Sequence, residues 1–155
     1  MRILVISDSH GDEFSLRYAI ECQEEAKMVI FLGDGCRDAV TVSQSFPDRK
    51  FVLLKGNCDF ACAYPEHSIE HIGGKTLYCT HGSSENVKYT LSELIYRAQS
   101  ANADIALYGH THIPVTDYRD GLHIFNPGSI RQGQYGVIDI TCAGVVCINM
   151  TLNFI

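Results

Sequence analysis

The sequence has no cluster of basic residues. Lysine and arginine together number 12 against 18 aspartates and glutamates, so the formal net charge at pH 7 is −6. A protein that binds nucleic acid regardless of its sequence needs a basic stripe, and this chain offers none. We therefore expect no nucleic-acid partner. A phosphorylated substrate is compatible with the acidic balance, because bound divalent cations reverse the local field.

Long apolar runs are also missing. No stretch approaches the roughly 18 apolar residues of a membrane-spanning helix. The run at 3–6 is too short for a signal peptide and leads into Asp8. The seven cysteines are odd in number, and their spacings match neither a disulfide framework nor a zinc finger. These absences predict a cytoplasmic protein with free thiols and no membrane partner.

The chain contains no internal repeat, linker or low-complexity segment. Its 155 residues, of which 46% are hydrophobic, suffice to bury a proper core. Charged residues make up 19%, which is ordinary for a globular protein. We expect a single domain over residues 1–155.

The first third of the chain alternates between strand and helix patterns. Three apolar runs are typical of buried strands: 3–6, 28–32 and 51–54. A first helix is expected after Asp12, which can act as its N-cap. A second helix is expected over 38–46, because Pro47 ends the pattern. This βαβαβ order predicts a parallel sheet with right-handed crossovers.

The remainder of the chain is predominantly β. Seven further runs have the pattern of strands: 67–72, 76–80, 105–107, 115–118, 122–125, 135–140 and 145–150. An amphipathic pattern predicts a helix over 87–101. Together the two parts predict an α/β fold in which two sheets pack face to face, with helices on the outside.

Five of the expected strands are followed by a polar loop with residues that can bind a metal. These residues are Asp8, His10, Asp34, Asn57, His81, His110 and His112. Ligands of open α/β sheets bind beyond the carboxyl ends of the strands, so we expect these side chains to converge there. Neutral imidazole is the commonest protein ligand for transition metals, and the group therefore predicts a metal site.

These loops resemble the signature of the calcineurin-like metallophosphoesterase family. The matching motifs are Asp8-Ser9-His10, Gly33-Asp34, Gly56-Asn57, His81-Gly82 and Gly109-His110-Thr111-His112. The resemblance covers essentially the whole chain. The short length and the Gly56-Asn57-Cys58-Asp59 variant resemble the small bacterial and archaeal phosphodiesterase branch. The resemblance implies an αββα sandwich of two mixed sheets, with a site for two divalent metal ions at the strand ends.

The resemblance also implies which side chains hold the two metals. One metal would be bound by Asp8, His10, Asp34 and His112. The other would be bound by Asp34, Asn57, His81 and His110, with Asp34 bridging. Two cations about 3.5–4 Å apart would activate a shared hydroxide for in-line attack on phosphorus. Asp34, Asn57 and His81 are the expected catalytic residues. The mixed nitrogen and oxygen ligands suit Mn, which we expect, or alternatively Ni, Zn, Fe or Mg.

The assignment places His110 and His112 on different metals. Alternation along an extended segment would point the two imidazoles apart, so the assignment requires a loop conformation. We expect Gly109 to permit that conformation.

Two loops depart from the family pattern. Many relatives have a histidine where this chain has Cys58, and the resemblance implies that this histidine protonates the leaving group or binds phosphate. A thiol titrates at about 8.5 and is a poor acid, so we interpret Cys58 as a space-filling residue. Relatives often show His-Gly-His where this chain has His81-Gly82-Ser83, and we keep His81 as the ligand.

Three further positions carry hypotheses with plain alternatives. Asp59 either orients a ligand histidine or is a solvated turn residue. The segment 126–129 resembles a family loop near the site, or else forms an ordinary turn. Arg131 is a candidate phosphate contact.

The expected function is a dinuclear-metal-dependent phosphodiesterase that hydrolyses a small phosphodiester. A phosphomonoesterase of the same fold is the alternative within the enzymes. A scaffold similar to the retromer subunit that shares this fold is the alternative outside them. All seven ligand positions carry a residue able to coordinate a metal, which favours an enzyme. The natural substrate and a homo-oligomeric state are left open.

Overall fold

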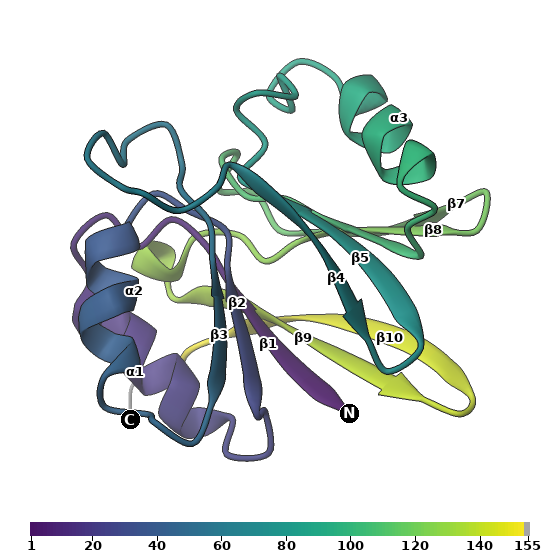
Figure 1. Cartoon of the computed structure of the whole chain (residues 1–155). Coiled ribbons are helices and arrows are strands. Elements are labelled where there is room, and N and C mark those ends of the chain that lie inside the picture. The colour runs from purple at the N-terminus through teal and green to yellow at the C-terminus, as the bar shows by residue number, and fades with distance from the viewer. Residues whose placement is uncertain (154–155) are drawn as a thin grey trace.

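The computed structural model describes residues 1–153 and contains two five-stranded sheets (Figure 1). The strands are β1 (Arg2–Ile6), β2 (Met28–Phe31), β3 (Lys50–Leu53), β4 (His67–Ile72), β5 (Lys75–Thr80), β6 (Ile105–Leu107), β7 (Val115–Arg119), β8 (Leu122–Asn126), β9 (Gln134–Thr141) and β10 (Gly144–Thr151). The helices are α1 (Glu13–Cys22), α2 (Cys36–Ser43) and α3 (Ser92–Ser100), with a short 3₁₀ helix η1 (Ile130–Gln132).

Both sheets are mixed. The first has the order β10-β9-β1-β2-β3, with parallel pairing among β1, β2 and β3 and antiparallel pairing of β9 with β1 and β10. The second has the order β4-β5-β6-β8-β7, with a parallel centre of β5, β6 and β8 and antiparallel edges. The predicted α/β sandwich of two mixed sheets with flanking helices is therefore confirmed.

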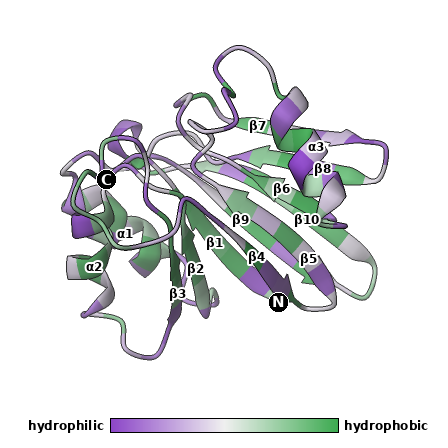
Figure 2. Cartoon of the chain, turned by 45° about the horizontal axis from the view of Figure 1, so that its top comes forward, coloured by the Kyte–Doolittle hydropathy of each residue, from purple (hydrophilic) through white to green (hydrophobic). Residues whose placement is uncertain are grey.

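Alternation along the central strands explains the layers. In β1, Ile3 and Val5 are fully buried in the core between the two sheets. Leu4 and Ile6 point the other way and pack with residues of α1 and α2. In the second sheet, Tyr78 packs in a third cluster together with Leu94 of α3. A strand that is apolar on both faces requires a cover on each, which gives the order helix, sheet, sheet, helix. Figure 2 shows the hydrophobic residues of β1 and β2 as continuous green.

The first helix begins where the sequence predicts. Asp12 is its N-cap, and its carboxylate Oδ1 accepts a hydrogen bond of 2.9 Å from the backbone N–H of Ser15. The second helix differs from the prediction of 38–46. It begins at Cys36 and ends at Ser43, after which the chain continues to Phe46 in single turns with bonds to the third preceding carbonyl.

The prediction for α3 was wrong over its first part. The helix begins at Ser92, and residues 83–90 form turns in which Asn86 has a left-handed backbone, with φ of +54°. Val87 donates its N–H to the Gly82 carbonyl and is buried in the same apolar cluster as Leu94. Its apolar character therefore reflects burial in a turn rather than a position on the helix. No helix among residues 1–153 is long and apolar enough to cross a membrane.

Candidate metal centre

The carboxyl ends of five strands meet on one side of the molecule (Figure 1). The loops after them are hydrogen-bonded to one another: the Asp8 N–H donates to the Gly33 carbonyl at 2.9 Å, and the Gly109 N–H to the His81 carbonyl at 3.0 Å. These contacts join the loops of both sheets. They bring together all seven predicted residues, Asp8 and His10 after β1, Asp34 after β2, Asn57 after β3, His81 after β5, and His110 and His112 after β6.

One group consists of Asp8, His10 and His112, which offer ligand atoms that all lie within 4.8 Å of one another. The His112 Nε2 atom lies 3.1 Å from Asp8 Oδ1 and 3.3 Å from His10 Nε2. Asp8 is fully buried, whereas His10 and His112 are partly exposed at 23% and 36%. A ligand on the two imidazoles is therefore reachable from solvent.

A second group consists of Asp34, His81 and His110, again with ligand atoms within 4.8 Å. The His81 Nε2 atom lies 3.4 Å from Asp34 Oδ2 and 3.1 Å from Asn57 Oδ1. Asp34 Oδ2 also lies 3.8 Å from His10 Nε2, which belongs to the first group. Asp34 therefore lies between the two groups, and its role as a bridging ligand stays a prediction.

His81 is oriented by the main chain. Its Nδ1 atom lies 2.9 Å from the Leu32 carbonyl oxygen, which can only accept a hydrogen bond. Nδ1 therefore carries the proton, and in the neutral ring Nε2 presents a lone pair to the oxygens of Asp34 and Asn57. Three electron-rich atoms then face one another, an arrangement that either a proton on Nε2 or a metal ion between them relieves. Holding a metal-binding imidazole through its other nitrogen is a common arrangement in metal sites.

The buried carboxylates of this site have no basic side chain of their own. Asp8 and Asp34 are 0% and 3% exposed, and within residues 1–153 only histidines form ion pairs with them. Buried charges need a partner, because desolvation without one costs several kcal/mol. Two carboxylates, an amide oxygen and four imidazoles form a donor set that fits divalent cations such as Mn, Zn, Ni or Fe.

Protonation equilibria of the site agree with this donor set. Burial opposes ionisation of Asp34, but its hydrogen bond with His81, the charge of that ring and the N–H of Cys58 outweigh it and lower the pKa. Burial likewise opposes protonation of His81, yet Asp34 and Asp8 raise its pKa. Burial, the charged His81 and Lys88 lower the pKa of His110. Without a metal, positive charge is thus drawn to the position beside Asp34.

Five of the seven side chains are on backbone that L-residues seldom adopt. The φ angles are +58° at Asp8, +45° at His10, +57° at Asp34, +66° at His110 and +58° at His112. Such conformations cost about 1–3 kcal/mol each and concentrate at functional sites. The predicted loop conformation of His110 and His112 is therefore present. Gly109 contributes through its small size rather than through its backbone angle: its φ is not positive, but a side chain there would collide with the Ser7 hydroxyl.

Asp59 anchors the loops rather than a histidine. Its two carboxylate oxygens accept backbone N–H hydrogen bonds of 2.8–2.9 Å from Asp34, Gly35, Cys36 and Gly56. Both earlier interpretations, a partner of a ligand histidine and a solvated turn residue, are therefore wrong. Four charge-assisted bonds fix the loop that carries Asp34, and one of them lies at the N-terminus of α2, where an anion is favoured.

Two further groups support these loops: the segment 126–129, which the family resemblance placed near the site, and Asp38, which sequence reasoning missed. The Ser129 hydroxyl donates to the Asp8 carbonyl at 2.8 Å, and the Asn126 amide donates to the Gly109 carbonyl at 3.0 Å. The segment 126–129 is therefore more than an ordinary turn, because it connects the loops that follow β1 and β6. The Asp38 carboxylate accepts from the Ser9 hydroxyl at 2.5 Å and the Gly11 N–H at 2.8 Å. Only the resemblance of 126–129 to a family loop signalled any of this.

Of the two remaining candidates, Cys58 lies at the edge of the metal centre, and Arg131 is an exposed residue of η1. The Cys58 sulfur offers a ligand atom within 4.8 Å of those of His10 and Asp34. Desolvation and the nearby carboxylates of Asp34 and Asp59 raise its pKa, which keeps it a neutral thiol. Arg131 is exposed on η1, and no hydrogen bond or ion pair connects its side chain to another residue within 1–153. Its contact with phosphate stays a prediction.

Several known proteins that are similar to this chain are phosphoesterases by name, which agrees with a metal-binding site of this composition. The calcineurin-like phosphoesterase superfamily domain matches residues 1–146. The chain is 34% identical over 131 residues to the probable metallophosphoesterase YsnB of Bacillus subtilis strain 168, which covers 84% of this chain and 76% of YsnB. It is 27% identical over 182 aligned positions to the phosphodiesterase YfcE of Escherichia coli strain K12, covering 96% and 93%. The crystal structure of a predicted phosphoesterase from Streptococcus pneumoniae TIGR4 superposes with a TM-score of 0.84 at 28% identity, covering 97% of this chain and 88% of that one.

Proposed function

Because the chain belongs to the calcineurin-like phosphoesterase superfamily, we propose that it is a phosphodiesterase that uses two divalent cations to hydrolyse a small phosphodiester. One observation supports this most strongly: two buried carboxylates face four imidazoles, and no lysine or arginine within residues 1–153 forms an ion pair with either carboxylate. The similarity to YfcE, which is named a phosphodiesterase, supports the diester.

The ligand assignment that we propose follows the two groups. Asp8, His10, Asp34 and His112 would hold one cation, and Asp34, Asn57, His81 and His110 the other. When bound, two such cations supply Lewis acidity, which lowers the pKa of a water molecule and offsets the charge of phosphate oxygens. We propose manganese, because the ligands are nitrogen and oxygen atoms.

Other residues of the chain hold the proposed ligands in place. The Leu32 carbonyl fixes the His81 ring, and the N–H of Cys58 donates to Asp34 Oδ1 at 2.7 Å, which leaves Oδ2 directed at His10 and His81. These contacts hold Asp34, Asn57 and His81 ready before substrate arrives. Such preorganisation lowers the barrier, because fixed groups need not rearrange during the reaction.

The residue at position 58 bears on the choice of leaving group rather than on the choice between a diester and a monoester. Cys58 is a neutral thiol at the edge of the metal centre, in the position where many relatives have a histidine. A thiol is a poor general acid at neutral pH and would protonate a leaving group only weakly. We therefore propose that substrates with good leaving groups react fastest. A phosphomonoesterase is the alternative.

The test removes all metals and then adds Mn²⁺, Ni²⁺, Zn²⁺ or Mg²⁺ separately. Hydrolysis of bis-p-nitrophenyl phosphate is compared with that of p-nitrophenyl phosphate. We expect metal-dependent diester hydrolysis that is abolished in Asp34→Ala and His110→Ala. His71→Ala is a matched control, because His71 is exposed on β4 and its ring is hydrogen-bonded to the Thr76 hydroxyl of the neighbouring strand. Equal activity in the metal-free protein would contradict the proposal. No activity with any metal, together with tight binding of a partner protein, would favour the scaffold.

A further inference from the structure

A cavity of about 640 Å³ lies directly beside the candidate metal centre. Three of its lining residues, Gly11, Gly35 and Cys58, each follow a predicted metal ligand in the sequence: His10, Asp34 and Asn57. The Cys58 sulfur lies within 4.8 Å of ligand atoms of both His10 and Asp34, so Cys58 belongs to the cavity wall and to the edge of the metal centre. This cavity is therefore a space beside the metal centre into which a group attached to phosphorus can extend.

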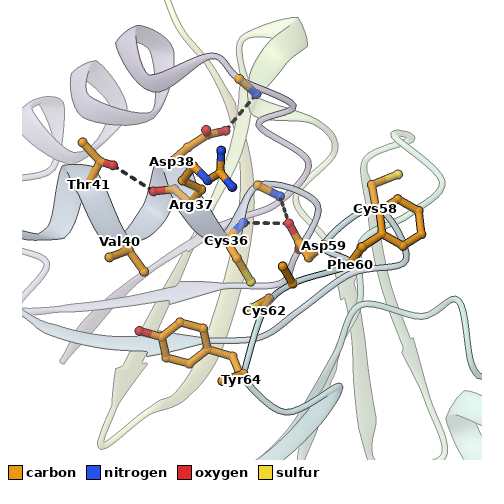
Figure 3. A pocket seen from close by; sticks show the side chains of 14 residues that line it. Cys36, Arg37, Asp38, Val40, Thr41, Cys58, Asp59, Phe60, Cys62 and Tyr64 are labelled. Atoms are coloured by element: carbon orange, nitrogen blue, oxygen red, sulfur yellow. Dashed lines mark hydrogen bonds between the residues drawn. The ribbon is translucent and has the colours of Figure 1, made fainter.

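The two side walls come from α2 and from the loop that follows β3. Figure 3 shows Arg37, Val40 and Thr41 on the helix and Phe60, Cys62 and Tyr64 on the loop that faces it. Phe60 is 95% exposed and Tyr64 is 38% exposed, and neither belongs to the apolar clusters of the interior. Two exposed aromatic rings at the wall of one cavity offer flat apolar surface to a ligand.

The charged side chains of the wall differ in whether the protein already hydrogen-bonds them. The Asp59 carboxylate accepts four backbone N–H groups, and the Asp38 carboxylate accepts from Ser9 and Gly11. Arg37 is exposed, and its guanidinium has no hydrogen bond or ion pair with any residue within 1–153. A guanidinium carries five N–H donors and no acceptor. The wall therefore presents free donors beside aromatic rings, while both of its carboxylates are engaged by the protein.

We propose that this cavity binds the organic group of the phosphoester, and that this group is a planar heteroaromatic ring with carbonyl acceptors, as in a nucleoside. Phe60 and Tyr64 contact the ring, and Arg37 donates to its carbonyl oxygens. The volume lies within the range of about 300–1,000 Å³ that is usual for small-molecule sites. The inference rests on the proposed phosphodiesterase function and names the substrate class and the residues that determine specificity.

The experiment uses two diesters that share a leaving group. One is thymidine 5′-(p-nitrophenyl phosphate), and the other is methyl p-nitrophenyl phosphate, which has no ring to fill the cavity. In the metal-loaded protein we expect Phe60→Ala and Arg37→Ala each to lower kcat/KM for the thymidine ester about tenfold, mainly through KM, as base stacking and bidentate contacts do elsewhere. The methyl ester should change less than about twofold. Tyr89→Ala is the matched control, because Tyr89 is 90% exposed and is not among the residues that line the cavity.

Equal effects on both esters, or no effect on either, would overturn the inference and leave the proposed function intact. If neither ester is hydrolysed with any metal, the proposed function fails and a binding experiment decides the inference. Thymidine 5′-monophosphate is then titrated into the ¹⁵N-labelled protein. Shifts at residues 37–41 and 58–64 that weaken in Phe60→Ala would support the cavity as its site. No shift in these segments at millimolar ligand would overturn it.

Discussion

Two clusters of buried carboxylates in this protein differ in how their charge is compensated. Glu85, 1% exposed, accepts hydrogen bonds from the Tyr78 hydroxyl at 2.9 Å and the Thr80 hydroxyl at 3.0 Å, and Arg97 lies 3.6 Å away. At the metal centre, Asp8 and Asp34 are equally buried but face histidines and an asparagine. The first cluster supplies its own cation, whereas the second does not.

This difference in charge compensation indicates that the Glu85 cluster stabilises the fold, whereas the strand-end cluster forms a binding site. Around Glu85, burial and the carboxylate raise the pKa of Tyr78 to about 12, so the phenol stays a hydrogen-bond donor. That cluster holds the turns between β5 and α3 and needs nothing from solvent. The strand-end cluster instead combines buried charge with five left-handed backbone positions. Strain, together with buried carboxylates that face histidines but no lysine or arginine, indicates a site that an added ligand completes.

The largest expected effect comes from the carboxylate that lies between the two groups. Asp34→Asn keeps the shape and the acceptor for the Cys58 N–H but removes the negative charge. We expect diester hydrolysis to fall on the order of a thousandfold, since several kcal/mol of metal-dependent stabilisation are lost. Steady-state kinetics at saturating Mn²⁺ measure it. Activity within tenfold of the original protein would remove Asp34 from the proposed mechanism.

The second prediction concerns the self-compensated cluster. Glu85→Ala leaves the buried Tyr78 hydroxyl without its acceptor and removes the shorter of the two bonds that the Thr80 hydroxyl can donate, the other going to the Glu66 carbonyl at 3.4 Å. We expect a loss of about 3 kcal/mol in the free energy of unfolding. Thermal unfolding should show a melting temperature lower by roughly 6–12 °C. Glu93→Ala is the control, because Glu93 is 45% exposed and binds the same Arg97. If both variants melt alike, the buried network contributes no more than a surface ion pair.

A third prediction tests how the loops are held. Asp59→Ala removes the acceptor of four backbone N–H groups around Asp34, and we expect metal affinity to fall about 10–100-fold. Equilibrium dialysis with Mn²⁺ measures the affinity. Asp48→Ala serves as the control, since Asp48 is 65% exposed and its ion pair is with Lys27, which is itself 71% exposed. Unchanged affinity in Asp59→Ala would show that the loop geometry does not depend on this carboxylate.

The smallest effect is expected at the edge of the metal centre. Cys58→His supplies a titratable acid near the position of the leaving group. We expect hydrolysis of phenyl phosphate, whose leaving group needs a proton, to rise about tenfold, and that of p-nitrophenyl phosphate to change little. Cys58→Ser should stay within about threefold of the original protein, because a hydroxyl is no better an acid than the thiol. A loss of diester hydrolysis in Cys58→Ser would instead assign a direct role to the thiol.

Much of the fold and of the candidate site was predictable because short stretches of sequence encode it. Runs such as Ile3–Ile6 are apolar on both faces, and each polar motif follows such a run directly. Parallel strands that share a sheet place the ends of those runs at one edge, so the proximity of Asp8, Asp34 and Asn57 follows from the pattern alone. Linking them to His81 and His110 of the other sheet required the family resemblance.

The remaining features depend on contacts that no local pattern encodes. The four N–H groups that bind Asp59 come from two separate loops, so its role appears only when those loops meet. Val87 is buried in a turn and therefore imitates a helix position, which displaced the expected start of α3. The cavity wall at 60–64 has no periodic pattern, because it belongs to a loop rather than to a helix or a strand.

Metal binding to the metal-free protein tests the central claim most directly, namely that the strand-end cluster lacks a cation that solvent must supply. Isothermal titration with Mn²⁺ should show two ions bound per chain in the original protein and in Glu85→Gln. Asp34→Asn should bind at most one, since its shared carboxylate charge is gone. Absence of binding to the original protein, or unchanged binding of two ions by Asp34→Asn, would contradict the account.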